Sequence, residues 1–309
     1  MRIAIMGSGG LGGYFGARLA RGGEDVIFIA RGAHLNAMQT RGLIVRSPGN
    51  GDVVLPVVRA TGDPAAAGVV DLVFVAVKLW DTTEAARAIL PMIGERTTVI
   101  SFQNGVDKDA AIGAVAGMEH MVGGVGYIGV AIAEPGVIAH TGTMARLVVG
   151  EHDGRRSERV ETFVAACRNA GIDASVAEHI RRVIWEKFVF LVGLSGSTAL
   201  MRTTIGPVRS DPGARRILAD AMREAVAVAR AEGVMLPEDF ADERLRFIDG
   251  LPPDMDSSLH VDLQRGHRLE LPWLAGAVAR RDAERGVPTP VNAIIRDALA
   301  LYAGGAHAA

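Results

Sequence analysis

The chain has 309 residues, of which 49% are hydrophobic, with 33 basic and 35 acidic side chains. This length exceeds a usual single domain and predicts two. The net charge of -2 argues against nucleic acid as a partner. The single cysteine, Cys167, excludes an internal disulfide framework and suits a reducing cytoplasm. Within the segment VAACRNAG, we expect Cys167 to be a small buried hydrophobic residue. No targeting segment is visible, so a cytoplasmic location is expected.

The first part of the chain alternates strand-like and helix-like segments. Apolar runs in RIAIMG, DVIFIAR, DLVFVAVK and TTVISFQNG are typical of parallel strands covered on both faces, and GGYFGARLARGG has helical spacing. This alternation predicts a doubly wound α/β sheet of the Rossmann type over residues 1–174. Further on, GVIAHTG and ARLVVGE are separated by Gly and Thr, which predicts two strands joined by a turn.

Helical patterns dominate residues 175–309, which are predicted to form an all-helical domain. Pro290 at a first helical position and Gly304-Gly305 at an end mark the last helix, with Thr289 as its expected N-cap. Pro272 should kink or restart its helix. The uncharged stretch 188–201 is shorter than the ~20 residues that cross a bilayer, so no membrane association is expected. The predicted helices cover 178–200, 211–232, a segment from near 256, and 290–303.

The stretch GSGGLGG follows the first strand and opens a helix. It fits the pattern G-x-G-x-x-G at Gly7, Gly9 and Gly12. In a dinucleotide site these glycines permit the tight turn, the approach of the pyrophosphate and close helix packing, and the helix N-terminus binds the phosphates. A glycine-rich turn without a ligand is the alternative. The predicted cofactor-binding residues here are Gly7, Ser8, Gly9, Gly10, Leu11 and Gly12.

The end of the second strand bears on the choice of cofactor. NAD-binding sites usually place a carboxylate there, but this chain has Ala30 and then Arg31. A guanidinium favours a 2′-phosphate, so NADPH is the predicted cofactor, and a solvated loop arginine is the alternative. Lys78 and Asn104 also follow strands and should lie at the same edge of the sheet. Either could instead be an ordinary strand end or turn residue.

The chain resembles the ketopantoate reductase (2-dehydropantoate 2-reductase) family over nearly its whole length. The matching pieces are GSGGLGGYFGARLA, VKLWDT, SFQNGVD, WEKFVF, SSLHVDLQRGHRLE and GVPTPVN. The resemblance implies a Rossmann domain followed by a helical domain, with an active site in the cleft between them. It implies NADPH-dependent reduction of a 2-oxo acid to a 2-hydroxy acid, with no metal.

The resemblance also implies roles for particular residues. Lys187 matches the catalytic lysine that protonates the carbonyl oxygen, and Glu270 matches its acidic partner. Ser258 matches a serine that binds the substrate carboxylate. Asn104 and Lys78 match groups around the nicotinamide end of the cofactor and the substrate, and Arg31 matches the 2′-phosphate binder.

The sequence departs from the family at two substrate-binding positions. Leu191 and Ser195 stand where the family has asparagines, four and eight residues after Lys187, on one helical face. The substrate pocket should therefore be more apolar, which leaves the particular 2-oxo acid open. Arg202 is a candidate for supplying replacement charge.

Lysine suits the role of proton donor because hydride delivery builds negative charge on the carbonyl oxygen, and burial can bring a lysine pKa toward neutrality. From helical spacing alone, Lys187 could instead extend its amine into water. Glu270 could be an exposed helix residue and Ser258 a helix cap.

Two other functions stay open. One is a non-catalytic NADPH-binding sensor, and the other is a reductase for a different substrate. The partner expected is a small 2-oxo acid, and a homodimer is one alternative for the oligomeric state.

Overall fold

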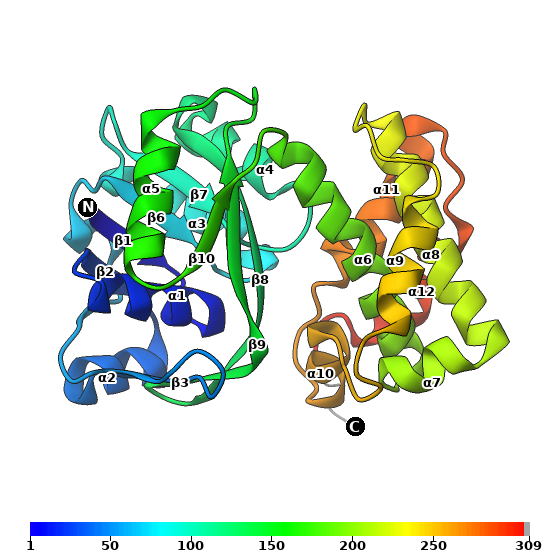
Figure 1. Cartoon of the computed structure of the whole chain (residues 1–309), viewed down its shortest axis with the longest axis horizontal. Coiled ribbons are helices and arrows are strands. Elements are labelled where there is room, and N and C mark those ends of the chain that lie inside the picture. Colours follow the sequence, from blue (N-terminus) through cyan, green and yellow to red (C-terminus); the bar gives the residue numbers. More distant parts are fainter. Residues whose placement is uncertain (306–309) are drawn as a thin grey trace. The chain divides into compact units, whose positions relative to one another are not determined.

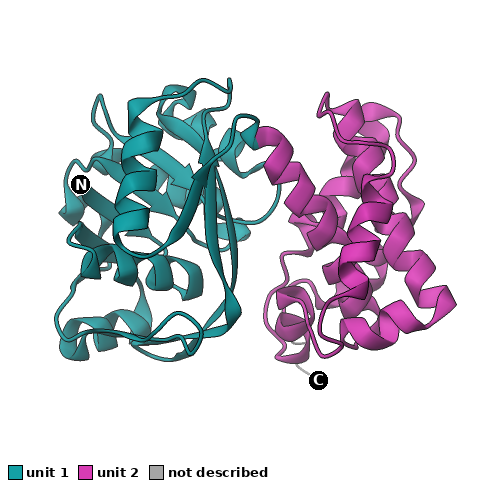
Figure 2. Ribbon diagram, in the orientation of Figure 1, with its two compact units in different colours: residues 1–180 teal, residues 181–309 magenta. Residues whose placement is uncertain are grey.

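The structure is a computed structural model that describes residues 1–305. The chain divides into two compact units, residues 1–180 and 181–309 (Figure 2). The division falls at the start of helix α6 (Ile180–Met201). The sequence-based boundary after residue 174 lies earlier because strand β10 (Asp173–Val176) still pairs with the sheet of the first unit.

A mixed ten-stranded sheet forms the centre of the first unit (Figure 1). Its order is β4-β3-β9-β8-β7-β6-β1-β2-β5, with β10 also on β9. The neighbours from β5 to β8 are all parallel, whereas β8 pairs with β9 and β3 with β4 in antiparallel fashion. The remaining strands are β1 (Arg2–Met6), β2 (Asp25–Ile29), β3 (Leu43–Arg46), β4 (Val53–Leu55), β5 (Arg59–Thr61), β6 (Leu72–Val75), β7 (Thr98–Ser101), β8 (Met121–Glu134) and β9 (Val137–Gly150).

Helices cover both faces of the parallel strands. Ile3 and Ile5 of β1 join a core with α1 and α5, whereas Ala4 and Met6 join a second core with α3 and α4. The side-chain period of two in a strand explains this division. The predicted doubly wound sheet is therefore confirmed. The helices are α1 (Gly10–Arg21), α2 (Gly32–Arg41), α3 (Thr82–Ala88), α4 (Lys108–Ala116) and α5 (Glu158–Asn169).

The prediction of two short strands within residues 136–151 is wrong. GVIAHTG and ARLVVGE belong to one strand, β9, which pairs along β8. The pairing shifts register between Ile128 and Gly129, whose partners are Ala145 and Thr141. The three extra residues of β9 form a bulge that contains Gly142 at φ +77°. A bulge and a turn use the same glycine chemistry, so the sequence pattern could not separate them.

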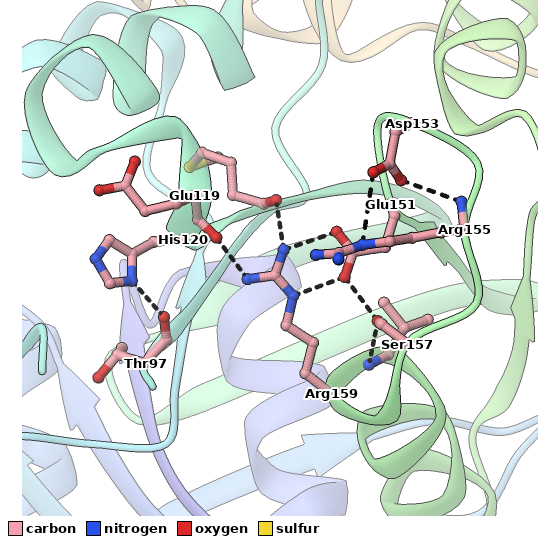
Figure 3. Close-up of polar contacts among 10 residues, drawn as sticks. Thr97, Glu119, His120, Glu151, Asp153, Arg155, Ser157 and Arg159 are labelled. Carbon is pink, nitrogen blue, oxygen red and sulfur yellow. Dashed lines mark hydrogen bonds and ion pairs between the residues drawn. The ribbon is translucent and has the colours of Figure 1, made fainter. Parts of the chain in front are cut away.

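An ion pair between the partly exposed Arg159 and the buried Glu151 lies at the edge of the sheet where β8 begins, opposite to the edge where β1 ends. Figure 3 shows its polar contacts. Arg159 of α5 donates to both oxygens of Glu151, at 2.6 and 2.7 Å, and to the carbonyls of Glu119 and Met121. The Glu151 carboxylate also accepts from Ser157 at 2.6 Å. Burial alone would raise the pKa of Glu151, but the hydrogen bonds from Arg159 and Ser157 lower it.

The second unit is helical throughout its described residues. Gly286 ends a helix in the left-handed region (φ +66°), and Pro290 stands at the first helical position of the last helix, as predicted. The Thr289 hydroxyl does not cap that helix. Instead, Glu224 accepts from the backbone N–H groups of Val291 and Asn292, at 2.7 and 2.9 Å. The helices after α6 are α7 (Ile205–Ser210), α8 (Pro212–Ala231), α9 (Phe240–Asp249), α10 (Ser258–Gln264), α11 (Ala275–Arg285) and α12 (Pro290–Leu299).

Two features of this unit bear on the sequence-based expectations. Pro272 lies in a 3₁₀ turn, Leu271–Trp273, and α11 restarts at Ala275, as a proline in a helical pattern requires. Among the described residues, one helix, α6, is long and apolar enough to cross a membrane. Most of it is buried inside the protein. A core helix of this composition passes the same test.

Candidate active site

The glycine loop between β1 and α1 has the geometry that close approach of a ligand requires. A side chain at Gly12 would place its Cβ 2.2 Å from the carbonyl oxygen of Gly7, so only glycine allows this packing. Gly7 has φ +99°, which favours glycine. At Gly9, by contrast, no atom other than those of Gly9 and its two chain neighbours lies within 4 Å of the Cβ position. The loop is tight toward the protein and open at Gly9, which fits the pyrophosphate of a dinucleotide.

The N-terminus of α1 completes this part of the site. Gly9 is the N-cap, and Gly10 and Leu11 are the first helical residues. The first N–H groups of a helix have no partner within it and attract anions. Ser8 is 2% exposed, and its backbone N–H donates to the carbonyl of Ile29 at 2.9 Å. The loop is therefore fixed to β2 while its helix end remains able to bind phosphate.

Arg31 lies two residues after the end of β2 and is the N-cap residue of α2. Its side chain is 65% exposed, and its Nη2 lies 3.2 Å from Oδ2 of Asp81, in the loop after β6. No carboxylate stands at the end of β2, but Asp81, in the 3₁₀ turn Leu79–Asp81 after β6, brings one to Arg31. An exposed pair of this kind contributes little to stability, so the guanidinium can exchange partners.

Lys78 and Asn104 lie in the loops after β6 and β7, at the same edge as the glycine loop and Arg31. The structure thus brings the four predicted sites of the first unit to neighbouring strand ends. Lys78 is exposed, with its amine 5.6 Å from the centre of the Trp80 ring. Asn104 is half-buried and precedes Gly105, at φ +84°.

Gln103 joins these two loops and was not predicted. Its Nε2 donates to the carbonyl of Val77 at 3.0 Å and to the Thr82 hydroxyl at 2.8 Å. Gln103 is the neighbour of Asn104, and Val77 is the neighbour of Lys78. The buried amide therefore fixes the spacing of the two predicted site residues. The sequence signal was the polar residue inside an apolar run, SFQNG, which was interpreted only as part of a turn.

In the second unit, α6 is continuous, so Lys187, Leu191 and Ser195 share one helical face as predicted. Lys187 and Leu191 are half-buried, whereas Ser195 is 2% exposed. Arg202 follows the helix with φ +54°, and its guanidinium stacks on the Tyr302 ring at 4.9 Å. Its charge is thus engaged with an aromatic face at the helix end.

Ser258 and Glu270 come from the segments around α10. Ser257, not Ser258, is the N-cap of α10, because its hydroxyl accepts from the backbone N–H of His260. The Ser257 hydroxyl also lies 2.8 Å from that of Thr198, which ties α10 to α6. Ser258, the first helical residue, is exposed. The helix-capping role considered for Ser258 is therefore filled by its neighbour, Ser257.

Glu270 is 8% exposed and lies outside any α-helix, which excludes the alternative of an exposed helix residue. Its neighbours Leu269 and Leu271 belong to one core with Ala199 of α6 and Leu259 of α10. This core anchors the backbone on both sides of Glu270 and beside Ser258. One hydrophobic core therefore contains the chain neighbours of both Ser258 and Glu270, together with Ala199 of the helix that carries Lys187.

A Rossmann-type unit with an open glycine loop, followed by a helical unit with a lysine on its first helix, defines a two-domain oxidoreductase. The chain belongs to the ketopantoate reductase family PanE/ApbA: the family matches residues 3–154, and its C-terminal domain matches residues 179–303. This confirms the resemblance seen in the sequence.

Individual relatives agree with this assignment. The chain is 33% identical over 304 residues to a 2-dehydropantoate 2-reductase of Halobacterium salinarum, covering 97% of this chain and 98% of that protein. A PanE/ApbA family ketopantoate reductase from Ralstonia eutropha has TM-score 0.90 at 32% identity, covering 98% of each chain. A D-mandelate dehydrogenase solved with NADH and anilino(oxo)acetate has TM-score 0.89 at 20% identity over 98% of each chain, which shows a shared fold.

Proposed function

We propose that this protein reduces a 2-oxo acid to a 2-hydroxy acid with NADPH, as a 2-dehydropantoate 2-reductase or a close paralogue. The observation that carries the proposal is Lys187, a half-buried lysine after which the rest of α6 carries no charge, in a chain that belongs to this family. Relatives at about one-third identity over almost the whole chain are named for this reaction.

The first unit supplies the cofactor site in this proposal. The backbone around Gly9 and the start of α1 bind the pyrophosphate, and Arg31 binds the 2′-phosphate. Lys78 and Asn104, held in register by Gln103, contact the nicotinamide end and the substrate. When bound, NADPH supplies the hydride.

The second unit supplies the groups that act on the substrate. Lys187 donates a proton to the carbonyl oxygen as negative charge develops there. Glu270, buried at 8% exposure, orients the lysine and the substrate, and Ser258 binds the substrate carboxylate. The C2 carbon gains a hydride and the oxygen gains a proton, so one keto acid, one hydride and one proton give one hydroxy acid.

Leu191 supports a variant of this function. The family has an asparagine at this position, and an isobutyl group cannot replace the hydrogen bonds of an amide. A polar substrate group facing Leu191 would lose its partner, at roughly 1–3 kcal/mol. We therefore propose that a 2-oxo acid with a more apolar tail competes well with ketopantoate as substrate.

The test is NADPH oxidation by the purified protein across a panel of 2-oxo acids that includes ketopantoate and analogues with apolar tails. Turnover of at least one of them is expected, with NADPH preferred over NADH. Tight NADPH binding without turnover of any 2-oxo acid would indicate a sensor and overturn the proposed reaction. A high kcat/KM for ketopantoate that no apolar analogue matches would overturn the apolar preference alone.

A further inference from the structure

His34 contacts the glycine loop, although it lies outside the dinucleotide fingerprint. It is half-buried in the first turn of α2. Its Nε2 lies 2.9 Å from the carbonyl oxygen of Ser8, inside the loop. Its Nδ1 accepts from the backbone N–H of Gly136, in the turn between β8 and β9, at 3.1 Å. One imidazole thus joins the loop to a turn about a hundred residues further along the chain.

These contacts determine the tautomer of His34. The N–H of Gly136 can only donate, so Nδ1 must be the unprotonated nitrogen. The proton is then on Nε2, which donates to the Ser8 carbonyl. Burial lowers the pKa of His34 and outweighs the bond to Ser8, which raises it. The neutral ring that both contacts require is therefore the form present at neutral pH.

The turn that holds His34 is itself anchored. Gly136 has φ +84°, and its carbonyl accepts from the backbone N–H of Ile44 in β3 at 2.9 Å. Its Cβ position lies only 3.1 Å from the Cβ of Ala37 on α2. A glycine is required by both the dihedral angle and this proximity. The Nδ1 side of the ring is thus fixed to the sheet.

The hydrogen bond from His34 also determines where the next N–H points. Ser8 is held by its N–H and by its hydroxyl, which donates to the carbonyl of Ile5 at 3.3 Å. Its carbonyl is held by His34. A trans peptide is planar, with its C=O and N–H directed to opposite sides. The N–H of Gly9 therefore points away from His34, and the Cβ position of the same residue is open.

We propose that His34 is a positioning residue for the cofactor, which orients the Ser8–Gly9 peptide so that the Gly9 N–H donates to the pyrophosphate. This rests on the proposed function, since it assumes that the loop binds a dinucleotide. The contribution of His34 is confined to the pyrophosphate, because the 2′-phosphate is assigned to Arg31. Both cofactors carry a pyrophosphate, so His34 acts equally on NADPH and NADH.

Three ligands separate the contributions: NADPH, NADH and adenosine 2′-monophosphate, which has the 2′-phosphate but no pyrophosphate. In titrations with His34→Leu, we expect the Kd of both cofactors to rise roughly fivefold, the scale of one lost hydrogen bond, and that of the monophosphate to stay unchanged. His34→Gln keeps an N–H donor near the position of Nε2 and should recover most of the affinity. Arg31→Ala should show the reverse pattern, with losses for NADPH and the monophosphate but not for NADH.

The outcomes distinguish this inference from the proposed function. Unchanged cofactor binding in His34→Leu overturns the inference and leaves the function standing. An equal loss for the monophosphate also overturns it, because the damage would then extend beyond the pyrophosphate. No binding of either cofactor to the wild-type protein overturns the proposed function, and the inference with it.

Discussion

The guanidinium of Arg31 pairs with the carboxylate of Asp81 at 3.2 Å, across the ends of two strands that are not neighbours in sequence. The pair links the residue proposed for the 2′-phosphate to the loop that carries Lys78. Because both side chains are partly exposed, we expect Asp81 to give way to a phosphate, which offers Arg31 more charge and two oxygens in fork geometry.

The first prediction concerns cofactor choice. Arg31→Ala should weaken NADPH binding about ten- to a hundredfold, because a charge-assisted contact is worth roughly 1.5–3 kcal/mol, and should barely change NADH binding. Fluorescence titration of both cofactors measures this. Asp81→Asn is the matched control: it removes the partner but keeps Arg31, so the preference for NADPH should remain. Equal losses for the two cofactors in Arg31→Ala would reject the assignment.

The second prediction concerns the proton donor. Lys187→Met keeps the length of the side chain but removes the ammonium, so turnover should fall by roughly two to four orders of magnitude. NADPH affinity and thermal unfolding should remain as in the wild type. Single-turnover NADPH oxidation measures the effect. Arg182→Met, an exposed change on the same helix that removes a pair with Glu186, should leave turnover intact. A near-normal rate in Lys187→Met would mean that its amine only extends into water.

The third prediction concerns substrate choice. Leu191→Asn should raise kcat/KM for ketopantoate relative to a 2-oxo acid with an apolar tail, since the amide offers hydrogen bonds that leucine lacks. Steady-state kinetics with both substrates measures the ratio. Ser195→Asn added to it tests the second position, but Ser195 is 2% exposed, so the larger side chain should cost some stability. A ratio that does not move would place Leu191 away from the substrate.

The fourth prediction concerns the ion pair at the other edge of the sheet. Arg159→Met leaves the Glu151 carboxylate, at 4% exposure, without its cation and should destabilise the first unit by about 3 kcal/mol. The pKa of Glu151 is lowered in the folded protein, so its contribution is complete at neutral pH and is lost as pH falls below about 4.5. The stability gap between wild type and variant should therefore narrow in acid.

Urea unfolding between pH 7 and pH 3 tests this. Arg155→Met is the control, because Arg155 pairs with Asp153 in solvent, with the two side chains 64% and 65% exposed, and should change stability by less than about 1 kcal/mol. If the difference in stability between the wild type and Arg159→Met did not change with pH, the dependence on the charge of Glu151 would be contradicted.

The fifth prediction concerns Cys167, which is fully buried, as the sequence suggested. Burial, together with the charge of Glu24, raises the pKa of its thiol to about 12. At pH 8 only on the order of one thiol in 10⁴ is then the reactive thiolate. The native protein should resist thiol reagents, while denaturant should expose one thiol per chain. Rapid labelling of the native protein would contradict the buried position.

The sequence predicted the elements whose signal is local. Continuous apolar runs identified β1, β2, β6 and β7, and proline marked the start of α12. The glycines at 304 and 305 do not mark its end, because α12 ends at Leu299 and a 3₁₀ turn, Ala300–Tyr302, follows it. The sequence did not predict β8, where glycines interrupt the strand pattern, or α9 between the long helices. The single strand β9 was divided because its bulge carries the residues of a turn. Because β9 pairs with β8 on both sides of the bulge, it is one strand. Such pairing depends on residues distant in sequence and cannot be predicted from the local pattern.

The same distinction holds for the candidate site. The glycine loop, Arg31 and Asn104 were predicted because each comes within a few residues of a strand end, and strand ends meet at one edge. Gln103, His34 and Asp81 were missed because their partners are distant in sequence: His34 reaches Gly136, and Asp81 reaches Arg31. Polar residues of this kind stand out only once the contacts that satisfy them are visible.

The position of α6 at the start of the second unit has a consequence for synthesis. Ala199 packs in a core with Leu259, Leu269, Ile295 and Leu299, which all emerge from the ribosome later. The first unit can fold as soon as β10 and the residues after it are free, because domains fold in order during translation. Helix α6 gains partners first from α8 and α10, and its packing stays incomplete until Ile295 and Leu299 of α12 are made. A chain that stops before α12 would expose this helix, so premature termination should produce aggregation or chaperone capture rather than a stable first unit with a harmless tail.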